Sequence, residues 1–297
     1  MAQNGTTYER WRVFFRKLKN KFQNIGMSAN SFYKKTKYKL IYRQEAKKTN
    51  DSIYLIYTMG KVASMSVLDA ITKRLPHVPV FAMHYMSKAN LDKQESQLGE
   101  SIHWDNRLYK NMHTQHALKI RKCIEESPQK QIKIITVIRE PLNQIISQIF
   151  QQLNLHDVEL LKIMTPESPV DYDYPEKWCN EELKAFSGIN ILDKTFNPHK
   201  GYEVYEYGRF SLLVIRFEDI NRVFSAAMND FSSVGDWILG GKNKAENKGY
   251  AIEYRKFRSE LAIMPDVIKN VYSSPFVRHF YTDEEITIFK KQWKIVD

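Results

Sequence analysis

The stretch from Ile53 to Ile71 places the strongest constraint on how this chain folds. It opens with five consecutive apolar or aromatic residues, Ile53–Tyr57, passes through the short segment Thr58–Ser66, and ends in Val67–Ile71, which has helical character. An unbroken apolar run followed by a turn and a helix is typical of a buried strand in a parallel sheet. The stretch therefore predicts a strand–loop–helix unit.

Three further apolar runs along the chain each end in a polar residue. Residues 78–83 end at His84, residues 132–138 end at Arg139, and residues 210–215 end at Arg216. The last two runs lead into helix-like segments, so strands and helices alternate. This pattern predicts an α/β fold with a mainly parallel central sheet flanked by helices. Residues 156–207 are expected to form an irregular, partly helical insertion, and the chain from Ala251 onward is expected to be helical.

The composition is that of a soluble globular protein. The chain has 297 residues, of which 43% are hydrophobic, and no apolar stretch is long enough for a membrane span. The first residues are charged and aromatic, unlike a secretory signal, so we expect a cytoplasmic protein. The two cysteines, Cys123 and Cys179, lack any metal-ligand spacing and are expected to be reduced thiols.

The net charge of +11 belongs to an N-terminal arm, residues 1–50, and the rest of the chain, 51–297, forms the α/β domain. The arm holds 13 Lys and Arg against 2 Asp and Glu, which leaves 32 of each sign for the domain. Aromatic and aliphatic residues recur at helical spacing in the arm among basic ones: Trp11, Phe14, Phe15, Leu18 and Phe22. Residues 8–24 are thus expected to form a basic amphipathic helix, which either contacts the anionic inner face of the cell membrane or packs on the domain. No nucleic-acid-binding module accompanies the arm, so nucleic acid is not an expected partner.

The segment Gly60-Lys61-Val62-Ala63-Ser64-Met65-Ser66 lies between the first strand and its helix. It offers backbone N–H groups, a cation and two hydroxyls at a helix N-terminus, which suits a phosphate or sulfate group. It is not a Walker A loop, because there the lysine directly precedes the magnesium-binding hydroxyl. Arg139 also stands at a strand end where a magnesium-binding aspartate would be expected.

A second candidate anion site begins where the third strand ends. Arg139 leaves the strand, Pro141 suits the first turn of the next helix, and Ser147 lies about two turns along that helix. An arginine and a hydroxyl can together hold a phosphate group. Taken singly, these residues have ordinary interpretations: Arg139 could pair with Glu140 or Asp219, and Ser147 could face a neighbouring helix.

The two motifs together resemble those of sulfotransferases that use 3′-phosphoadenosine-5′-phosphosulfate (PAPS). Residues 60–66 are similar to the 5′-phosphosulfate loop of that family, and Arg139, Pro141 and Ser147 match the spacing of its 3′-phosphate motif. More narrowly, most of 52–293 resembles the bacterial family of capsular polysaccharide synthesis proteins, through segments that include Trp178–Leu183 and Val214–Asp219. Two positions depart from the loop pattern: Met65 replaces a frequent threonine, and Gly60 replaces a proline.

The resemblance implies a P-loop-NTPase-like sulfotransferase fold and a carbohydrate O-sulfotransferase activity. PAPS would be the co-substrate, adenosine 3′,5′-bisphosphate (PAP) the product and a glycan the acceptor, without a metal. The resemblance assigns Lys61 to charge neutralisation on the leaving group and residues 60–66, Arg139, Ser147 and Lys248 to nucleotide binding. His84 is the candidate general base, because it ends the second strand beside the loop and histidine titrates near neutrality.

Several alternatives stay open at this point. His113 and His116 are spaced as a metal pair without an evident third ligand. Glu218 and Asp219 could cap the following helix or serve as a different base, and the aromatic residues of 156–207 could stack on sugar rings or simply pack. Two other functions remain: an ATP-dependent kinase on the same scaffold, and a non-catalytic polysaccharide-assembly protein at the membrane.

Overall fold

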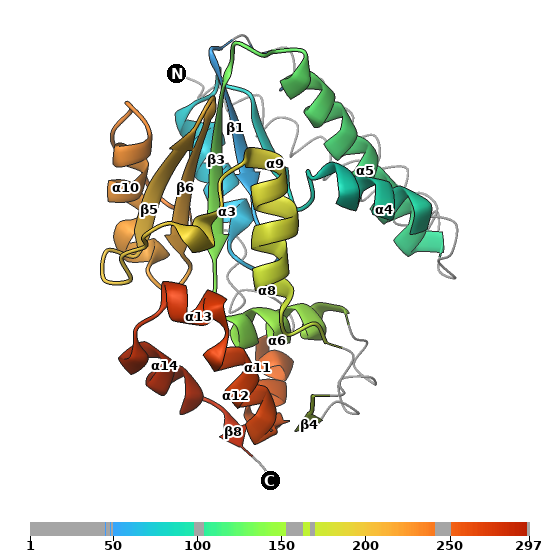
Figure 1. Cartoon of the computed structure of the whole chain (residues 1–297), viewed down its shortest axis with the longest axis vertical. Coiled ribbons are helices and arrows are strands. Elements are labelled where there is room, and N and C mark those ends of the chain that lie inside the picture. The colour runs from blue at the N-terminus through green and yellow to red at the C-terminus, as the bar shows by residue number, and fades with distance from the viewer. Residues whose placement is uncertain are drawn as a thin grey trace, which may run out of the picture.

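The computed structural model describes residues 45, 48, 50–97, 104–152, 163–166, 170–240 and 251–295. Figure 1 shows the path of the chain. The strands are β1 (Ser52–Tyr57), β2 (Val80–Met83), β3 (Gln131–Ile138), β4 (Ile163–Met164), β5 (Tyr202–Tyr207), β6 (Phe210–Arg216), β7 (Ala262–Ile263) and β8 (Lys294–Ile295). The helices are α3 (Ser64–Arg74), α4 (Lys88–Gln97), α5 (Trp104–Glu125), α6 (Pro141–Gln152), α8 (Tyr174–Lys177), η1 (Trp178–Lys184), α9 (Ala185–Ser187), η2 (Ile191–Asp193), α10 (Ile220–Phe231), α11 (Ala251–Glu260), α12 (Pro265–Ser273), α13 (Pro275–Phe280) and α14 (Asp283–Lys290). The amphipathic helix expected over residues 8–24 lies outside the described residues.

The central sheet has the strand order β2-β1-β3-β6-β5. Strands β1, β2, β3 and β6 are mutually parallel where they pair, and β5 runs antiparallel to β6. The four parallel strands are those predicted from the apolar runs, because a strand covered on both faces needs apolar residues on both. The predicted α/β class with a mainly parallel central sheet is thus confirmed.

Each face of the sheet is covered by its own layer of helices. On one face, Ile56 and Val137 pack with the buried sides of α3 and α10. On the other face, Leu55 and Ile134 pack with α5 and η1. Alternate residues of one strand therefore enter different cores, as the two-residue period of a strand requires.

Strand β5 is an edge strand where we expected irregular structure. It joins β6 through a two-residue loop, Gly208-Arg209, and Tyr207 pairs with Phe210 across it. Gly208 has a φ of 56°, which suits the first position of such a loop. The YEVYEY sequence of β5 mixes charged and aromatic residues because only one of its edges is paired, and this mixture concealed the strand.

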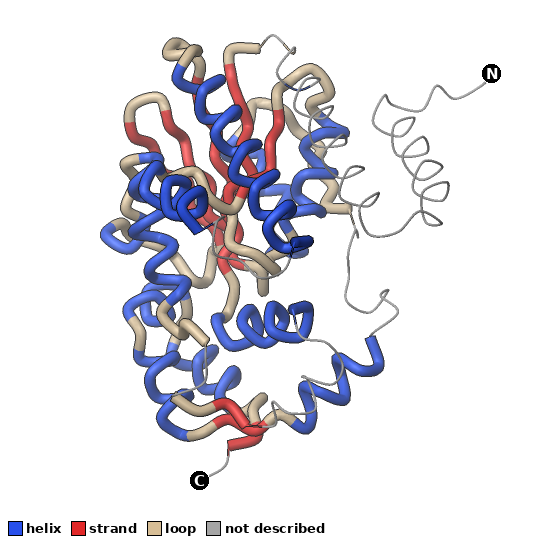
Figure 2. The backbone as a smooth tube through the Cα atoms, turned by 90° about the vertical axis from the view of Figure 1, so that its right-hand side faces the viewer, coloured by secondary structure: helices blue, strands red, loops and turns tan. Residues whose placement is uncertain are grey.

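The C-terminal helices lie beyond the carboxyl ends of the parallel strands. Figure 2 shows α6 and the C-terminal elements as a separate tier below the sheet. The helical character predicted from Ala251 onward is confirmed, with a small three-stranded sheet, β4-β7-β8, as an addition. This tier faces the edge at which parallel-sheet proteins bind ligands.

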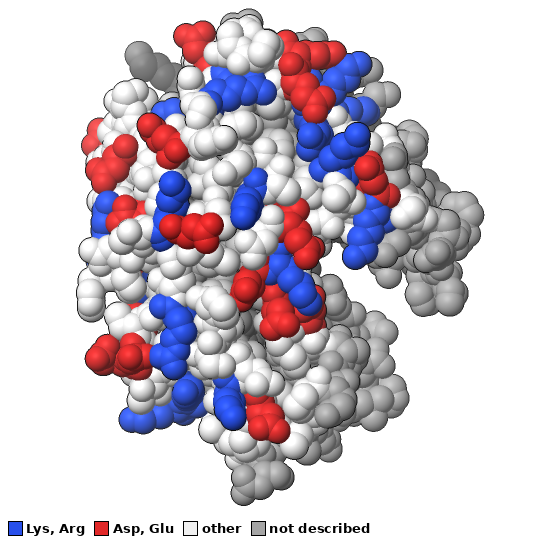
Figure 3. Space-filling model, viewed as in Figure 1, with Lys and Arg blue, Asp and Glu red and all other residues white. Residues whose placement is uncertain are grey.

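One face of the described surface carries interspersed charges. On the face shown in Figure 3, acidic and basic side chains alternate without a large patch of one sign. This agrees with the balanced charge of residues 51–297 in the sequence. None of the helices that the structure describes has the length and apolar character needed to cross a membrane.

Candidate functional site

The loop between β1 and α3 has a backbone shape that suits an anion. Lys61 and Ala63 have φ values of 67° and 61°, the left-handed region that side-chain-bearing residues seldom adopt. Alternation of right- and left-handed conformations turns successive N–H groups toward one side and forms an anion-binding concavity. The loop leads into α3, whose first turn has no acidic residue and no side-chain cap. The positive end of the helix dipole therefore remains open to an anion.

Two side chains from the neighbouring segment hold the loop in this shape. Arg139 Nη1 donates to the carbonyl oxygen of Lys61 at 2.9 Å, and Gln144 Nε2 donates to that of Gly60 at 3.0 Å. Arg139 follows β3, and Gln144 lies in the first turns of α6. The two motifs singled out in the sequence, 60–66 and 139–147, are therefore in direct contact.

Among the described residues, some of the buried polar atoms without a hydrogen-bond partner belong to Arg139 and to the first turn of α6. Arg139 Nε, Gln144 Oε1 and Asn143 Oδ1 are buried and unpaired, and the guanidinium of Arg139 stacks on Phe217 with its carbon 4.4 Å from the ring centre. Burial lowers the pKa of Arg139, but a guanidinium keeps its charge in proteins. An unpaired buried donor costs about 1–3 kcal/mol, and a bound ligand or water would remove that cost.

The other residues predicted to bind the nucleotide differ in how far their side chains are exposed. Ser66 is buried in the first turn of α3, Ser64 is half-buried, and Met65 is 42% exposed. Ser147 is half-buried on α6, one turn beyond Gln144. Lys248 lies outside the described residues.

The structure places His84 at the end of β2, beside the residue that starts the loop. His84 Nδ1 lies 2.7 Å from the carbonyl oxygen of Thr58, and Trp178 Nε1 donates to the carbonyl oxygen of His84 at 3.0 Å. A carbonyl can only accept, so the hydrogen of the neutral ring resides on Nδ1. Nε2 is then the ring atom that can take a proton.

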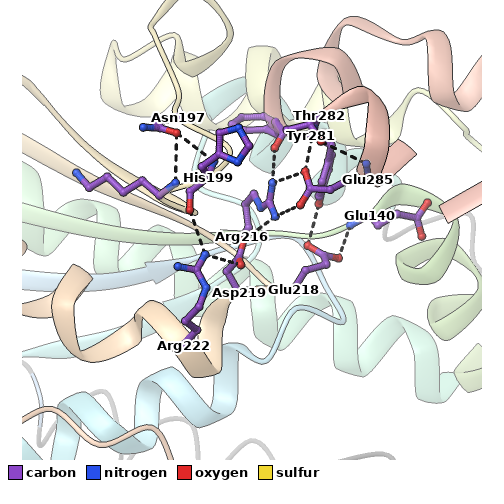
Figure 4. Close-up of polar contacts among 12 residues, drawn as sticks. Glu140, Asn197, His199, Arg216, Glu218, Asp219, Arg222, Tyr281, Thr282 and Glu285 are labelled. Carbon is purple, nitrogen blue, oxygen red and sulfur yellow. Dashed lines mark hydrogen bonds and ion pairs between the residues drawn. The ribbon is translucent and has the colours of Figure 1, made fainter. Parts of the chain in front are cut away.

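A network of hydrogen-bonded polar groups lies at the carboxyl ends of β3 and β6 (Figure 4). Glu218 accepts hydrogen bonds from the backbone N–H of Glu140 at 2.9 Å and from the hydroxyl of Tyr281 at 3.0 Å. Glu140 is fully buried and accepts from the backbone N–H groups of Leu142 and Asn143 in the first turn of α6. Burial raises the pKa of both carboxyl groups. The network thus fixes the start of α6, which carries Gln144.

These contacts test one of the alternatives left open for the acidic residues, the capping of the following helix. Asp219 is the N-cap residue of α10, but its side chain makes no capping hydrogen bond and instead pairs with Arg216 at 2.6 Å and Arg222 at 2.7 Å. Glu140 caps α6 with its carboxylate. The predicted side-chain cap by Glu218 or Asp219 is therefore wrong, because the arginines and the start of α6 recruit these carboxylates.

The surroundings of His116 and of the two cysteines do not indicate a metal site among the described residues. Burial and the nearby Lys119 lower the pKa of His116 to about 4. In the part of the chain that the structure describes, no group of three or more His, Cys, Asp or Glu side chains is arranged for a metal ion. Cys123 and Cys179 are free thiols, and Cys179 is completely buried.

Most described aromatic residues between 156 and 207 have partners within the protein. Trp178 is 2% exposed, the hydroxyl of Tyr202 donates to Asp230 at 2.8 Å, and that of Tyr205 donates to the Thr195 carbonyl at 2.8 Å. Tyr207, by contrast, is 64% exposed. Packing therefore accounts for Trp178, Tyr202 and Tyr205.

One family resembles the middle and end of the chain. Residues 169–282 match the family model NKWYS, described as "putative capsular polysaccharide synthesis protein". The similarity predicted from Trp178–Leu183 and Val214–Asp219 is confirmed over this range. The match does not extend to the loop at 60–66 or to 139–147. No curated protein and no solved structure matches the chain.

Three residues that shape the site carry little signal in the sequence. Gln144 lies between Arg139 and Ser147 of the second motif, but a glutamine inside a helix gives no sign of its orientation. In the sequence, Glu140 is next to Arg139 and suggests an ion pair with it, whereas in the structure it caps α6. Glu182 stands in a segment that carries the family resemblance, yet nothing in its neighbours indicates that it is only 1% exposed.

Proposed function

We propose that this protein is a PAPS-dependent sulfotransferase with a P-loop-NTPase-like sulfotransferase fold. It transfers a sulfuryl group to a hydroxyl of a glycan during synthesis of a capsular or other cell-surface polysaccharide. The observation that carries the proposal is the hydrogen bond from Arg139 to the Lys61 carbonyl, which joins the two anion-binding motifs. The similarity of residues 169–282 to capsular polysaccharide synthesis proteins supports a glycan acceptor.

The nucleotide is assigned to the two joined motifs. The backbone of residues 60–66, with Ser64 and Ser66, binds the 5′-phosphosulfate, and the unpaired donor of Arg139 supports a role for it, with Ser147, at the 3′-phosphate. Lys248 is a further candidate for the 3′-phosphate. No metal is needed, because cationic side chains can offset the charge that develops on the leaving group.

His84 and Lys61 carry the chemical step in this proposal. His84 Nε2 removes the proton of the acceptor hydroxyl as the oxygen bonds to sulfur. The bond between sulfur and the 5′-phosphate oxygen breaks, and Lys61 neutralises the charge on the departing PAP. The contact of Nδ1 with the Thr58 carbonyl favours this role, because in the neutral ring it places the hydrogen on Nδ1 and leaves Nε2 as the acceptor.

The place of action follows from the acceptor. Polysaccharide precursors assembled at the cytoplasmic face of the membrane would be accessible to a protein held there by a basic arm. The proposal therefore includes a cytoplasmic enzyme peripheral to the membrane, with residues 8–24 as the contact.

Ligand binding separates this proposal from the two other functions. Calorimetry is run on the full chain with PAP alone and with ATP plus magnesium. The sulfotransferase requires tighter binding of PAP without metal. Tighter binding of ATP with magnesium would indicate a kinase, and no binding of either would indicate a non-catalytic protein.

The catalytic assignment predicts large losses of activity. Lys61→Ala and His84→Ala should each lower sulfuryl transfer to a glycan acceptor by about 100-fold or more, as is usual for loss of a proton-transfer or charge-stabilising group. Transfer from radiolabelled PAPS measures this rate. His77→Ala is the control, because His77 is exposed at the start of the segment that enters β2. Full activity of His84→Ala would remove histidine from the mechanism.

A further inference from the structure

A buried carboxylate on the π-helix η1 binds the segment that carries His84. Glu182 is 1% exposed and accepts hydrogen bonds from the backbone N–H of Met86 at 2.8 Å, the N–H of Ser87 at 3.1 Å and the hydroxyl of Ser87 at 2.7 Å. It also accepts from the hydroxyl of Tyr57, the last residue of β1. Burial and this carboxylate raise the pKa of Tyr57, so the phenol keeps the proton that it donates.

A second side chain of η1 binds the other end of the same segment. Trp178 Nε1 donates to the carbonyl oxygen of His84, and the Trp178 ring packs edge-on against Tyr57 with ring centres 5.1 Å apart. A π-helix bonds each residue to the fifth one along, so residues four apart lie near one face. Trp178 and Glu182 therefore act as two anchors on one face of η1. Such helices are frequent at functional sites.

These anchors determine where the imidazole of His84 lies. Trp178 binds the backbone carbonyl of His84, and Glu182 binds the backbone N–H groups two and three residues further on. The carbonyl of Thr58 binds Nδ1 of the His84 ring. Thr58 directly follows Tyr57, which Glu182 also binds. The same carboxylate thus fixes both the segment bearing the ring and the strand end that supplies the acceptor for Nδ1.

We propose that Glu182 and Trp178 are positioning residues for His84. They hold its ring on the Thr58 carbonyl, so that Nδ1 carries the hydrogen and Nε2 accepts the proton. The inference rests on the proposed function for the role of Nε2, but the placement of the ring does not. Glu182 itself is too deeply buried to touch a substrate.

The test uses two variants that preserve side-chain shape. Glu182→Gln replaces the charged acceptor of four hydrogen bonds with a neutral amide, which weakens the three bonds to Oε2 and puts an NH₂ group, unable to accept, opposite the Ser87 hydroxyl. Trp178→Phe removes the N–H bonded to residue 84 and keeps an aromatic ring. Glu181→Gln is the matched control, because Glu181 is the exposed neighbour on the same helix.

Two readouts are followed in the full chain. Nitrogen-15 NMR of histidine-labelled protein should show His84 as the Nδ1–H tautomer in the wild type and in Glu181→Gln, and as a mixture in Glu182→Gln and Trp178→Phe. Sulfuryl transfer should fall by about 100-fold in Glu182→Gln, since small displacements of a reacting group cost this much. Affinity for PAP should be unchanged.

The outcomes are separable. A wild-type tautomer and rate in Glu182→Gln would overturn the inference, as would an Nε2–H tautomer in the wild type. If Glu182→Gln does not fold, Trp178→Phe decides by the same two criteria. A shifted tautomer in a protein whose wild type neither binds PAP nor transfers sulfuryl would support positioning of His84 and refute the proposed function.

Discussion

At the scale of single residues, the candidate site depends on backbone conformations that its side chains disfavour. Lys61 and Ala63 both have positive φ values, although neither is glycine, and Gly60 does not. A left-handed conformation costs a residue with a Cβ atom about 1–2 kcal/mol. The hydrogen bonds from Arg139 and Gln144 to the loop carbonyls offset this cost. Strain of this kind is retained where a surrounding structure enforces it, commonly at functional sites.

Ala63 allows this strain to be measured directly. Ala63→Gly removes the Cβ atom and should raise the free energy of unfolding by up to about 1 kcal/mol, once the larger backbone entropy of glycine in the unfolded chain is subtracted. Ala63→Val should lower it by about 2 kcal/mol, because a branched Cβ fits the left-handed region poorly. Urea denaturation measures both changes.

Ala70 provides the control for the same substitution. It lies inside α3 with a buried side chain, so Ala70→Gly should lower the free energy of unfolding by about 1 kcal/mol. Opposite signs at Ala63 and Ala70 are expected. A loss of equal size at both positions would mean that the loop is unstrained.

At the scale of elements, the apolar runs of the sequence predicted the parallel strands, but they did not predict the hydrogen bonds of the carboxylates near the strand ends. Residues such as Leu55 and Ile134 lie in short runs that are mostly apolar, and a strand buried on both faces is the element that such runs form in an α/β protein. Strand β5 was missed because it is an edge, although Gly208-Arg209 between two strand-like runs was a usable hairpin signal. The burial of Glu182 and the contacts of Glu218 could not be predicted, because their hydrogen-bond partners come from segments far away in the sequence.

The junction between β6 and α14 illustrates such a long-range support. Arg216 is 2% exposed and is held by Glu285, by Asp219 at 2.6 Å and by the Phe280 carbonyl at 3.0 Å. Glu285 also closes a capping box with Thr282 at the start of α14. One carboxylate thus serves a helix cap and a partly buried ion pair.

Glu285→Gln separates these two roles. Glutamine can still complete a capping box, but it removes the charge that pairs with Arg216, so we expect the free energy of unfolding to fall by about 2 kcal/mol. Thr282→Ala, which removes only the cap, should cost about 1 kcal/mol. Glu181→Gln, which changes an exposed carboxylate of η1, is the control and should have the smallest effect in the same denaturation experiment. A Glu285→Gln protein as stable as this control would contradict a stabilising role for the ion pair.

At the scale of the whole molecule, the excess positive charge and the candidate site lie in different parts of the chain. The arm carries the whole net charge of +11, whereas the residues that contact the loop belong to the balanced domain. Two residues at the end of the arm contact the domain: the Glu45 carboxylate accepts from the Val80 N–H at 2.9 Å, and Lys48 donates to the Val78 carbonyl at 3.3 Å. A cut before Glu45 therefore keeps the contacts that secure β2 and leaves the site intact.

Removal of residues 1–43 tests what the arm does. If the arm binds lipid, the full chain should sediment with phosphatidylglycerol vesicles but not with phosphatidylcholine vesicles, because basic residues attract an anionic surface while aromatic ones insert. The shortened chain should lose this binding and keep its affinity for PAP. The triple variant Trp11→Ser, Phe14→Ser, Phe15→Ser keeps the charge and should bind vesicles more weakly than the full chain. If the arm instead packs on the domain, the full chain should ignore both kinds of vesicle, and the shortened chain should unfold at a lower temperature because an apolar surface has been uncovered.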